Sequence, residues 1–251
     1  MLKLFPYILW GDFVKNSIIA LALSALICIL SVLFCTVDSV KTSAIINNDF
    51  PVIIIDAGHG GEDGGAVAID GTFEKDINLQ IALRVNEFLS VFGYKTHLIR
   101  TTDTAIHTTG DTIRERKVSD IHNRADTMNL YENCIYLSIH QNKYEDGRIW
   151  GAQTFYSDNF DESREIAQLI QKAVKSQLQP ENKRQVKKSG TDIYVLYNAT
   201  KPAVMVECGF VSNQNELNLL KDNAYQGKMA LSIAIGIVNY NISEVYNGSE
   251  I

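Results

Sequence analysis

Residues 52–66 read VIIIDAGHGGEDGGA, a run of branched apolar residues that ends in Asp56 and continues into glycines around His59. A continuous β-branched run of this kind is typical of a central strand that is buried on both faces. The glycines allow the chain to turn sharply after the strand, and they leave space beside His59 for a metal and a bulky substrate. A phosphate-binding loop is the alternative role for such glycines, but the G-x-G-x-x-G and Walker spacings are absent here.

The pattern of strand followed by helix continues along the chain. From residue 74 to residue 94, apolar residues recur at near-helical spacing, and Gly93 provides a stop. Further strands are predicted at 95–100, 134–140, 151–157, 192–198 and 202–210, and further helices at 117–130, 163–179, 213–220 and 225–240. Strands that alternate with helices predict a single layered α/β domain, residues 51–243, with a mixed, largely parallel sheet flanked by helices. Ligands of such sheets bind in the loops beyond the strand ends.

The first 38 residues differ from the rest in composition. Residues 18–37 carry no charge, and about twenty apolar residues are what a helix needs to cross a bilayer. Lys3 and Lys15 precede this segment, which indicates that the preceding side is cytoplasmic and that the rest of the chain is exported. The run is long for a signal peptide and no clear A-x-A site follows it, which favours an uncleaved membrane anchor over a cleaved or secretory signal. Residues 39–50 read as a linker and residues 244–251 as a tail.

Four polar side chains stand where predicted elements begin or end. His59, His140 and Glu207 each follow a buried-looking apolar run, and Glu74 opens the first long helix. Each has an ordinary explanation alone, such as a hydrogen-bonded structural histidine or a glutamate that compensates a helix dipole. Together, two imidazoles and the Glu74 carboxylate are a ligand set for catalytic zinc, with one position left for water. Glu207 is then expected to take a proton from the attacking water and pass it to the leaving nitrogen.

Four segments in this order resemble the signature of the zinc-dependent N-acetylmuramoyl-L-alanine amidases, the type 3 cell-wall amidases. They are DAGHGGEDGGA at 56–66, FEKD at 73–76, SIHQN at 138–142 and PAVMVECGFVSN at 202–213. The resemblance implies one Zn²⁺ held by His59, Glu74 and His140, with Glu207 as the catalytic acid/base. It also implies hydrolysis of the amide bond between N-acetylmuramic acid and L-alanine in peptidoglycan.

Within this family, the compact length and the single N-terminal apolar segment resemble the sporulation amidases of endospore formers. That similarity implies a role in spore cortex maturation, through muramic-δ-lactam formation, on the extracytoplasmic face or in the forespore intermembrane space. No wall-binding module is recognisable in the sequence, so an activating or localising protein partner is a further hypothesis. Two other classes stay open: a catalytically silent peptidoglycan-binding protein, and a zinc peptidase that cuts within the stem peptide.

Other polar residues carry weaker signals. Asp56 and Asn142 lie close in sequence to the two histidines and are candidates to orient the imidazoles, with ordinary loop hydrogen bonding as the alternative. Turn chemistry suffices to explain Asp63, and a solvated face is the expectation for Arg124. The basic segment 183–188 is a candidate contact for an acidic wall polymer or a partner. A net charge of −6 argues against binding nucleic acid through a broad basic surface.

Overall fold

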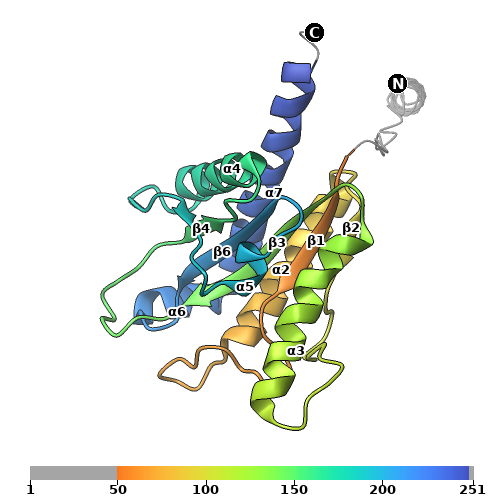
Figure 1. Cartoon of the computed structure of the whole chain (residues 1–251). Helices are drawn as coiled ribbons and strands as arrows, with labels where there is room; N and C mark the ends of the chain where they lie inside the picture. Colours follow the sequence, from red (N-terminus) through yellow and green to blue (C-terminus); the bar gives the residue numbers. More distant parts are fainter. Residues whose placement is uncertain (1–49, 249–251) are drawn as a thin grey trace, which may run out of the picture. The chain divides into compact units, whose positions relative to one another are not determined.

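The structure is a computed structural model (Figure 1). It describes the backbone of residues 50–248 and the side chains of residues 50–243. The predicted membrane segment, residues 1–38, lies outside the described residues, as does all but the last residue of the predicted linker, residues 39–50. Within residues 50–248, no helix is both long enough and apolar enough to span a bilayer.

Six strands form one sheet in the order β2-β1-β3-β6-β4-β5. The strands are β1 (Val52–Ala57), β2 (Thr96–Leu98), β3 (Cys134–Asn142), β4 (Gln153–Tyr156), β5 (Lys187–Lys188) and β6 (Ala203–Phe210). All neighbouring strands are parallel except β4 and β6, which are antiparallel. The mixed, largely parallel sheet predicted from the sequence is therefore confirmed.

Helices cover both faces of the sheet (Figure 1). The larger core lies under α2 (Glu74–Val91), α4 (Asp161–Gln177), α6 (Gln214–Leu220) and α7 (Asn223–Gly248). A smaller core on the other face, which includes Ile54, Tyr136 and Met205, lies under the short helix α5 (Tyr194–Tyr197) and the 3-10 turn η1 (Thr127–Leu130). The helix α3 (Ile113–Asp126) contacts α5 and continues into η1. Since β1 is buried from both sides, its continuous apolar sequence is explained.

Two elements predicted from the sequence differ from the structure, one in its type and one in where it begins. Residues 192–198, predicted as a strand, contain the helical turn α5, so this prediction is wrong. Val195 and Leu196 are adjacent and both buried in the smaller core, which a helical turn allows and the alternation of a strand does not. The helix predicted at 117–130 begins earlier, at Ile113, because Thr112 and Glu115 form a capping box there.

The last helix, α7, runs to Gly248 and so includes residues 244–248 of the predicted tail. The domain boundary at residue 243 stays a prediction.

Candidate metal centre

The carboxyl ends of β1, β3 and β6 lie side by side because these strands are parallel neighbours. His59 follows the end of β1, and His140 of β3 is in register with Glu207 of β6. Glu74 is the first residue of α2 and its buried carboxylate faces both histidines. The fold therefore brings the four site residues named from the sequence into one place.

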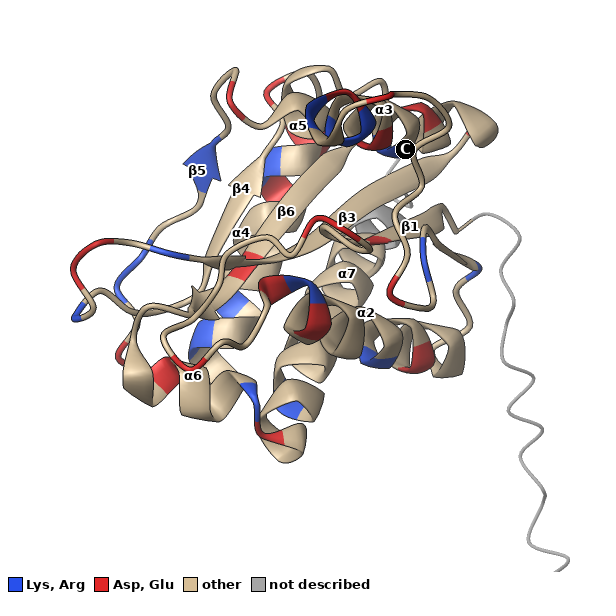
Figure 2. Cartoon of the chain, turned by 90° about the horizontal axis from the view of Figure 1, so that it is seen from below, with Lys and Arg blue, Asp and Glu red and all other residues tan. Residues whose placement is uncertain are grey.

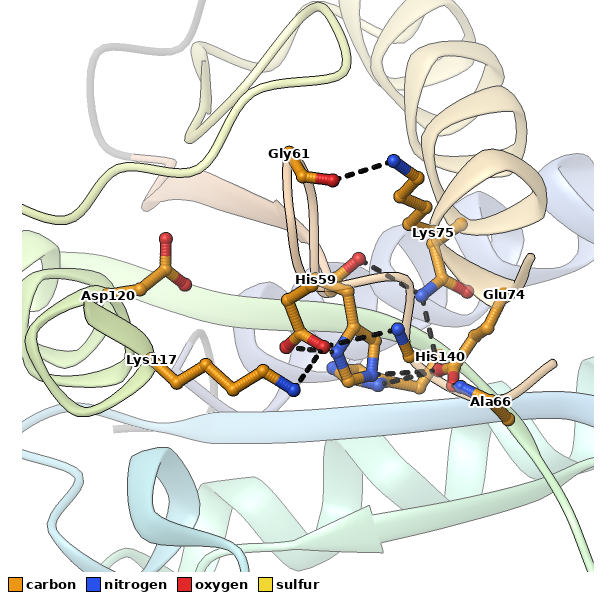
Figure 3. Close-up of polar contacts among 12 residues, drawn as sticks. His59, Gly61, Ala66, Glu74, Lys75, Lys117, Asp120 and His140 are labelled. Atoms are coloured by element: carbon orange, nitrogen blue, oxygen red, sulfur yellow. Dashed lines mark hydrogen bonds and ion pairs between the residues drawn. The ribbon is translucent and has the colours of Figure 1, made fainter. Parts of the chain in front are cut away.

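Two histidine nitrogens point at one carboxylate oxygen (Figure 3). Oε1 of Glu74 lies 3.3 Å from Nε2 of His59 and 2.9 Å from Nδ1 of His140. One ligand atom from each of the three residues lies within 4.8 Å of the others. Zinc ligands at about 2.1 Å in a tetrahedral arrangement lie roughly 3.4 Å apart, so only small shifts would let these donors share one ion. The residues fit a zinc ion in both donor type and spacing.

The histidine and carboxylate charges in this centre stabilise one another. Burial lowers the pKa of His59, but the carboxylates of Asp63 and Glu74 outweigh burial and raise it to about 9. Burial also disfavours an ionised Glu74, yet both histidines hold the pKa of this carboxyl well below its usual range. A cation that binds between these groups displaces protons, so metal binding should weaken as the pH falls.

Asp63 orients the first histidine. Its Oδ2 lies 2.8 Å from Nδ1 of His59. Its Oδ1 accepts a hydrogen bond from the Gly65 backbone and forms an ion pair with Lys117. The turn chemistry expected from the sequence therefore accounts for only part of its role. With Nδ1 held by a carboxylate, Nε2 of His59 is left facing Glu74, which is the arrangement that carboxylate–histidine pairs adopt at zinc sites. The sequence signal was the four-residue spacing from His59 across the glycine turn.

Glu74 is itself fixed by donors from three segments. Its Oε2 accepts from the Ala66 backbone at 2.8 Å, and its Oε1 accepts from the Gln141 backbone at 3.0 Å and from Nδ2 of Asn78 at 3.2 Å. The side chains of Asn78 and Gln141 also bond to each other, and both are buried. Sequence reasoning missed these two residues. Asn78 follows Glu74 by one helical turn on the buried side of α2, which is the signal that points to it.

Two glycines leave room for the ligand side chains rather than for the substrate. A Cβ atom on Gly58 would lie 2.1 Å from Nε2 of His140. Gly65 has φ +67°, and a Cβ there would lie 2.6 Å from Cδ2 of His59 and 2.7 Å from Oε2 of Glu74. The close packing of the imidazoles and Glu74 therefore depends on the missing side chains at these two positions.

Within residues 50–248, Asp56 forms no hydrogen bond with an imidazole, although the charge of His140 acts on its carboxylate. Its carboxylate pairs with Arg124 and accepts hydrogen bonds from the hydroxyls of Tyr136 and Ser138, each at 2.8 Å. Burial disfavours the charged carboxylate, but Arg124 outweighs burial and the pKa of Asp56 is lowered. The other orienting candidate, Asn142, accepts from Val211 through its backbone carbonyl, and no hydrogen bond within residues 50–248 joins its side chain to either histidine. The residue that performs the orienting contact is Asp63.

Buried arginines hold the backbone that carries His59. Arg124 is 3% exposed, so the expected solvated face is wrong for this residue, and its Nη2 donates to the His59 carbonyl at 2.7 Å. Nε of Arg100 donates to the Ala57 carbonyl and Nη2 to the Gly58 carbonyl. His59 has φ +63°, a conformation that non-glycine residues rarely adopt. The two guanidiniums stabilise three successive carbonyls around this strained residue.

Glu207 lies beside the three ligand candidates in a different environment. Burial raises its pKa to about 7, an effect that His140 opposes and Glu74 reinforces. Its Oε2 is buried and has no hydrogen-bond partner within the described part of the chain. A cavity of about 330 Å³ opens here, lined by the four site residues and by apolar side chains that include Ile193 and Met205. A carboxyl with a pKa near neutrality can both accept and return a proton in such a cavity.

Residues 53–239 match the sequence model of the N-acetylmuramoyl-L-alanine amidase family. The chain belongs to this family. The germination-specific N-acetylmuramoyl-L-alanine amidase of Bacillus subtilis strain 168 is 37% identical over 190 residues, which are 75% of this chain and 79% of the relative. The family resemblance predicted from four short motifs is therefore confirmed.

Solved amidase structures share the fold. The CwlD amidase of Clostridioides difficile, determined in complex with the GerS lipoprotein, is 38% identical, with a TM-score of 0.74 over 77% of this chain and 99% of that chain. An N-acetylmuramoyl-L-alanine amidase from Clostridium difficile 630 is 29% identical, with a TM-score of 0.67 over 77% of this chain and 98% of that one. The match extends over nearly the whole of each solved chain.

Proposed function

We propose that this amidase holds one Zn²⁺ through His59, Glu74 and His140 and hydrolyses the bond between N-acetylmuramic acid and L-alanine in peptidoglycan. The observation that carries the proposal is the convergence of three zinc-type donors beside Glu207 in one cavity. Glu207 is a buried carboxyl, and one of its oxygens has no hydrogen-bond partner among the described residues. The similarity to a germination-specific amidase and to CwlD supports a role in the sporulation and germination cycle. Within that cycle, the proposed substrate is the spore cortex, where removal of the stem peptide precedes muramic-δ-lactam formation.

A zinc ion at this position would polarise the amide carbonyl and make water a stronger nucleophile. Glu207 carries the proton: it takes one from the water whose oxygen attacks the carbonyl carbon, and it delivers that proton to the amide nitrogen as the carbon–nitrogen bond breaks. The products are a lactyl carboxyl group on the sugar and a peptide with a free amine. The apolar wall around Ile193 and Met205 limits water at Glu207, which keeps its pKa near 7.

The proposed location is the extracytoplasmic side of a membrane, reached through residues 1–38. The proposal rests on the uncharged run at residues 18–37 and on the substrate, which lies outside the cytoplasm. A protein partner is also proposed, because the related CwlD amidase was solved in complex with the GerS lipoprotein.

The test is to incubate the full chain with purified peptidoglycan and zinc and to identify the released fragments by mass spectrometry. Stem peptides that begin with a free alanine, absent with the Glu207→Gln variant, are the expected result. Peptides cut internally would instead indicate a peptidase. If the zinc-loaded chain released no fragments, with or without its partner, the hypothesis of a catalytically silent wall-binding protein would replace the proposal.

A further inference from the structure

Most of the basic side chains near the metal centre are neutralised by a carboxylate. Lys75, Arg116, Lys117 and Arg124 each form an ion pair. On the other side of Glu207, across β4 and β5, the pattern changes. Within residues 50–248, neither Arg184 nor Lys187 forms an ion pair with an acidic side chain, although the next residue, Lys188, pairs with Asp158. Figure 2 shows the two lysines of β5 at the edge of the sheet.

Arg184 is held in place with part of its guanidinium unused. Its Nε donates to the Trp150 carbonyl at 2.9 Å and its Nη1 to Oε1 of Gln153 at 3.1 Å, while the guanidinium carbon lies 4.6 Å from the centre of the Phe210 ring. Its Nη2 makes no hydrogen bond to any described residue. The nearby carboxylate of Glu216 accepts from the Phe210 backbone through its Oε2 and interacts electrostatically with Arg184, but the two form no ion pair. A guanidinium fixed in this way is suited to bind a carboxylate with little loss of side-chain freedom.

Strand register places Gln153, which binds this guanidinium, opposite Glu207. Gln153 of β4, which binds Arg184, is the Cα partner of Glu207 in the antiparallel pair. Directly opposed residues of such a pair share one face of the sheet, with Cβ atoms about 5 Å apart. A peptide that extends from the site beside Glu207 across β4 would therefore pass Gln153 and then reach Arg184.

Lys187 lies on the same face as Glu207. It is the Cα partner of Phe155, which in turn is the partner of Met205, two residues before Glu207. Since side chains alternate along a strand, Met205, Glu207, Phe155 and Lys187 share a face, and Lys188 belongs to the opposite one. Nζ of Lys187 lies 5.5 Å from the centre of the Phe155 ring and is exposed. Two cations that form no ion pair within residues 50–248 thus lie on the far side of β4 from Glu207.

We infer that Arg184 and Lys187 form a binding site for carboxylates of the stem peptide, on the side of the scissile bond from which the peptide leaves. The inference rests on the proposed amidase function. An extended peptide advances about 3.3 Å per residue along a path like this one, so acidic groups within its first few residues reach these cations. A carboxylate matches the planar fork of Arg184, and the sugar of the substrate, being N-acetylated, offers no charge to either cation near the bond that is cut.

The experiment measures binding separately from catalysis. In the full chain carrying Glu207→Gln, the substrate stays uncut, and calorimetry gives Kd for two synthetic N-acetylmuramoyl peptides that differ only in whether their peptide carboxylates are free or amidated. We expect the free-carboxylate ligand to bind roughly tenfold more tightly at low salt, and this preference to shrink with added salt. Adding Lys187→Gln or Arg184→Gln should remove most of the preference, whereas the matched control Lys188→Gln should retain it.

Equal Kd values for the two ligands would overturn the inference, as would an equal loss with Lys187→Gln and Lys188→Gln. Selective binding of a phosphate-bearing wall polymer at Lys187, with no preference between the two peptides, would also overturn it. Arg184 supports the Trp150 carbonyl, so its variant can fail to fold, and Lys187→Gln then decides the result alone. Failure of the amidase function is recognised separately, because the unmodified chain loaded with zinc would then cleave neither ligand.

Discussion

Replacing Glu207 with glutamine is expected to stabilise the metal-free chain at neutral and alkaline pH while abolishing turnover. Glu207 has a buried oxygen that finds no hydrogen-bond partner in residues 50–248, and burial raises its pKa from 4.5 to about 7. Ionising this carboxyl in the folded chain therefore costs free energy that a neutral glutamine does not incur.

The sign and the pH window follow from the two pKa values. Below about pH 4.5, the Glu207 carboxyl is protonated in both the folded and the unfolded chain. Its ionisation then adds no difference between the free energies of unfolding of the unmodified chain and the Glu207→Gln variant. Between 4.5 and 7, the unfolded chain loses the proton while the folded chain keeps it, so the free energy of unfolding of the unmodified protein falls with pH. A shift of this size corresponds to about 3 kcal/mol, reached near pH 7 and constant above it.

The assay is urea unfolding followed by circular dichroism, in the presence of a chelator, for both proteins between pH 4 and pH 9. The quantity to plot is the difference between their free energies of unfolding, because the other titrating groups are common to both proteins. Saturating zinc should reduce the difference, since a nearby cation favours the ionised carboxylate. A difference that stays constant across this pH range would refute the reasoning that burial keeps Glu207 protonated.

Three further outcomes are expected. Asp63→Asn should weaken zinc binding by roughly 10- to 100-fold in calorimetry, because the carboxylate that orients the first imidazole is lost; unchanged affinity would contradict this role. Gly65→Ala should abolish zinc binding, because a Cβ would collide with two ligand side chains, whereas Gly71→Ala, with φ +85° and open space, should keep it and cost about 1 kcal/mol in denaturant unfolding. Arg124→Leu should destabilise the chain by about 3–5 kcal/mol, because it leaves Asp56 buried without its partner; a loss below 1 kcal/mol in the same unfolding assay would contradict that.

The largely parallel sheet and the edge that carries the site could be predicted from the sequence for a simple reason. The apolar runs at 52–55, 134–139 and 203–206 identify strands buried on both faces, and parallel strands place their following residues at one edge. The polar residues His59, His140 and Glu207 were therefore expected to meet. Residues 192–198 misled the prediction, because β-branched and aromatic residues favour strands, whereas the packing of Val195 and Leu196 into one core selects a helical turn.

The residues that contact the site residues could be identified only from the tertiary structure. Asp56 and Asp63 are both close to His59 in sequence, but the strand directs Asp56 toward Arg124, and the glycine turn brings Asp63 back to the imidazole. Arg124 is 65 residues from His59 and Arg184 is 31 residues from Gln153, and each pair meets only through packing of separate elements.

The sequence by itself determined the layered α/β class, the amidase family and the four polar residues at the strand and helix ends, because local periodicity and short motifs encode them. Only the tertiary structure decided which groups orient those residues, why the pKa of Glu207 is near 7, and which cations form no ion pair within residues 50–248. These properties depend on distances and burial between segments far apart in the chain, and no local pattern specifies them.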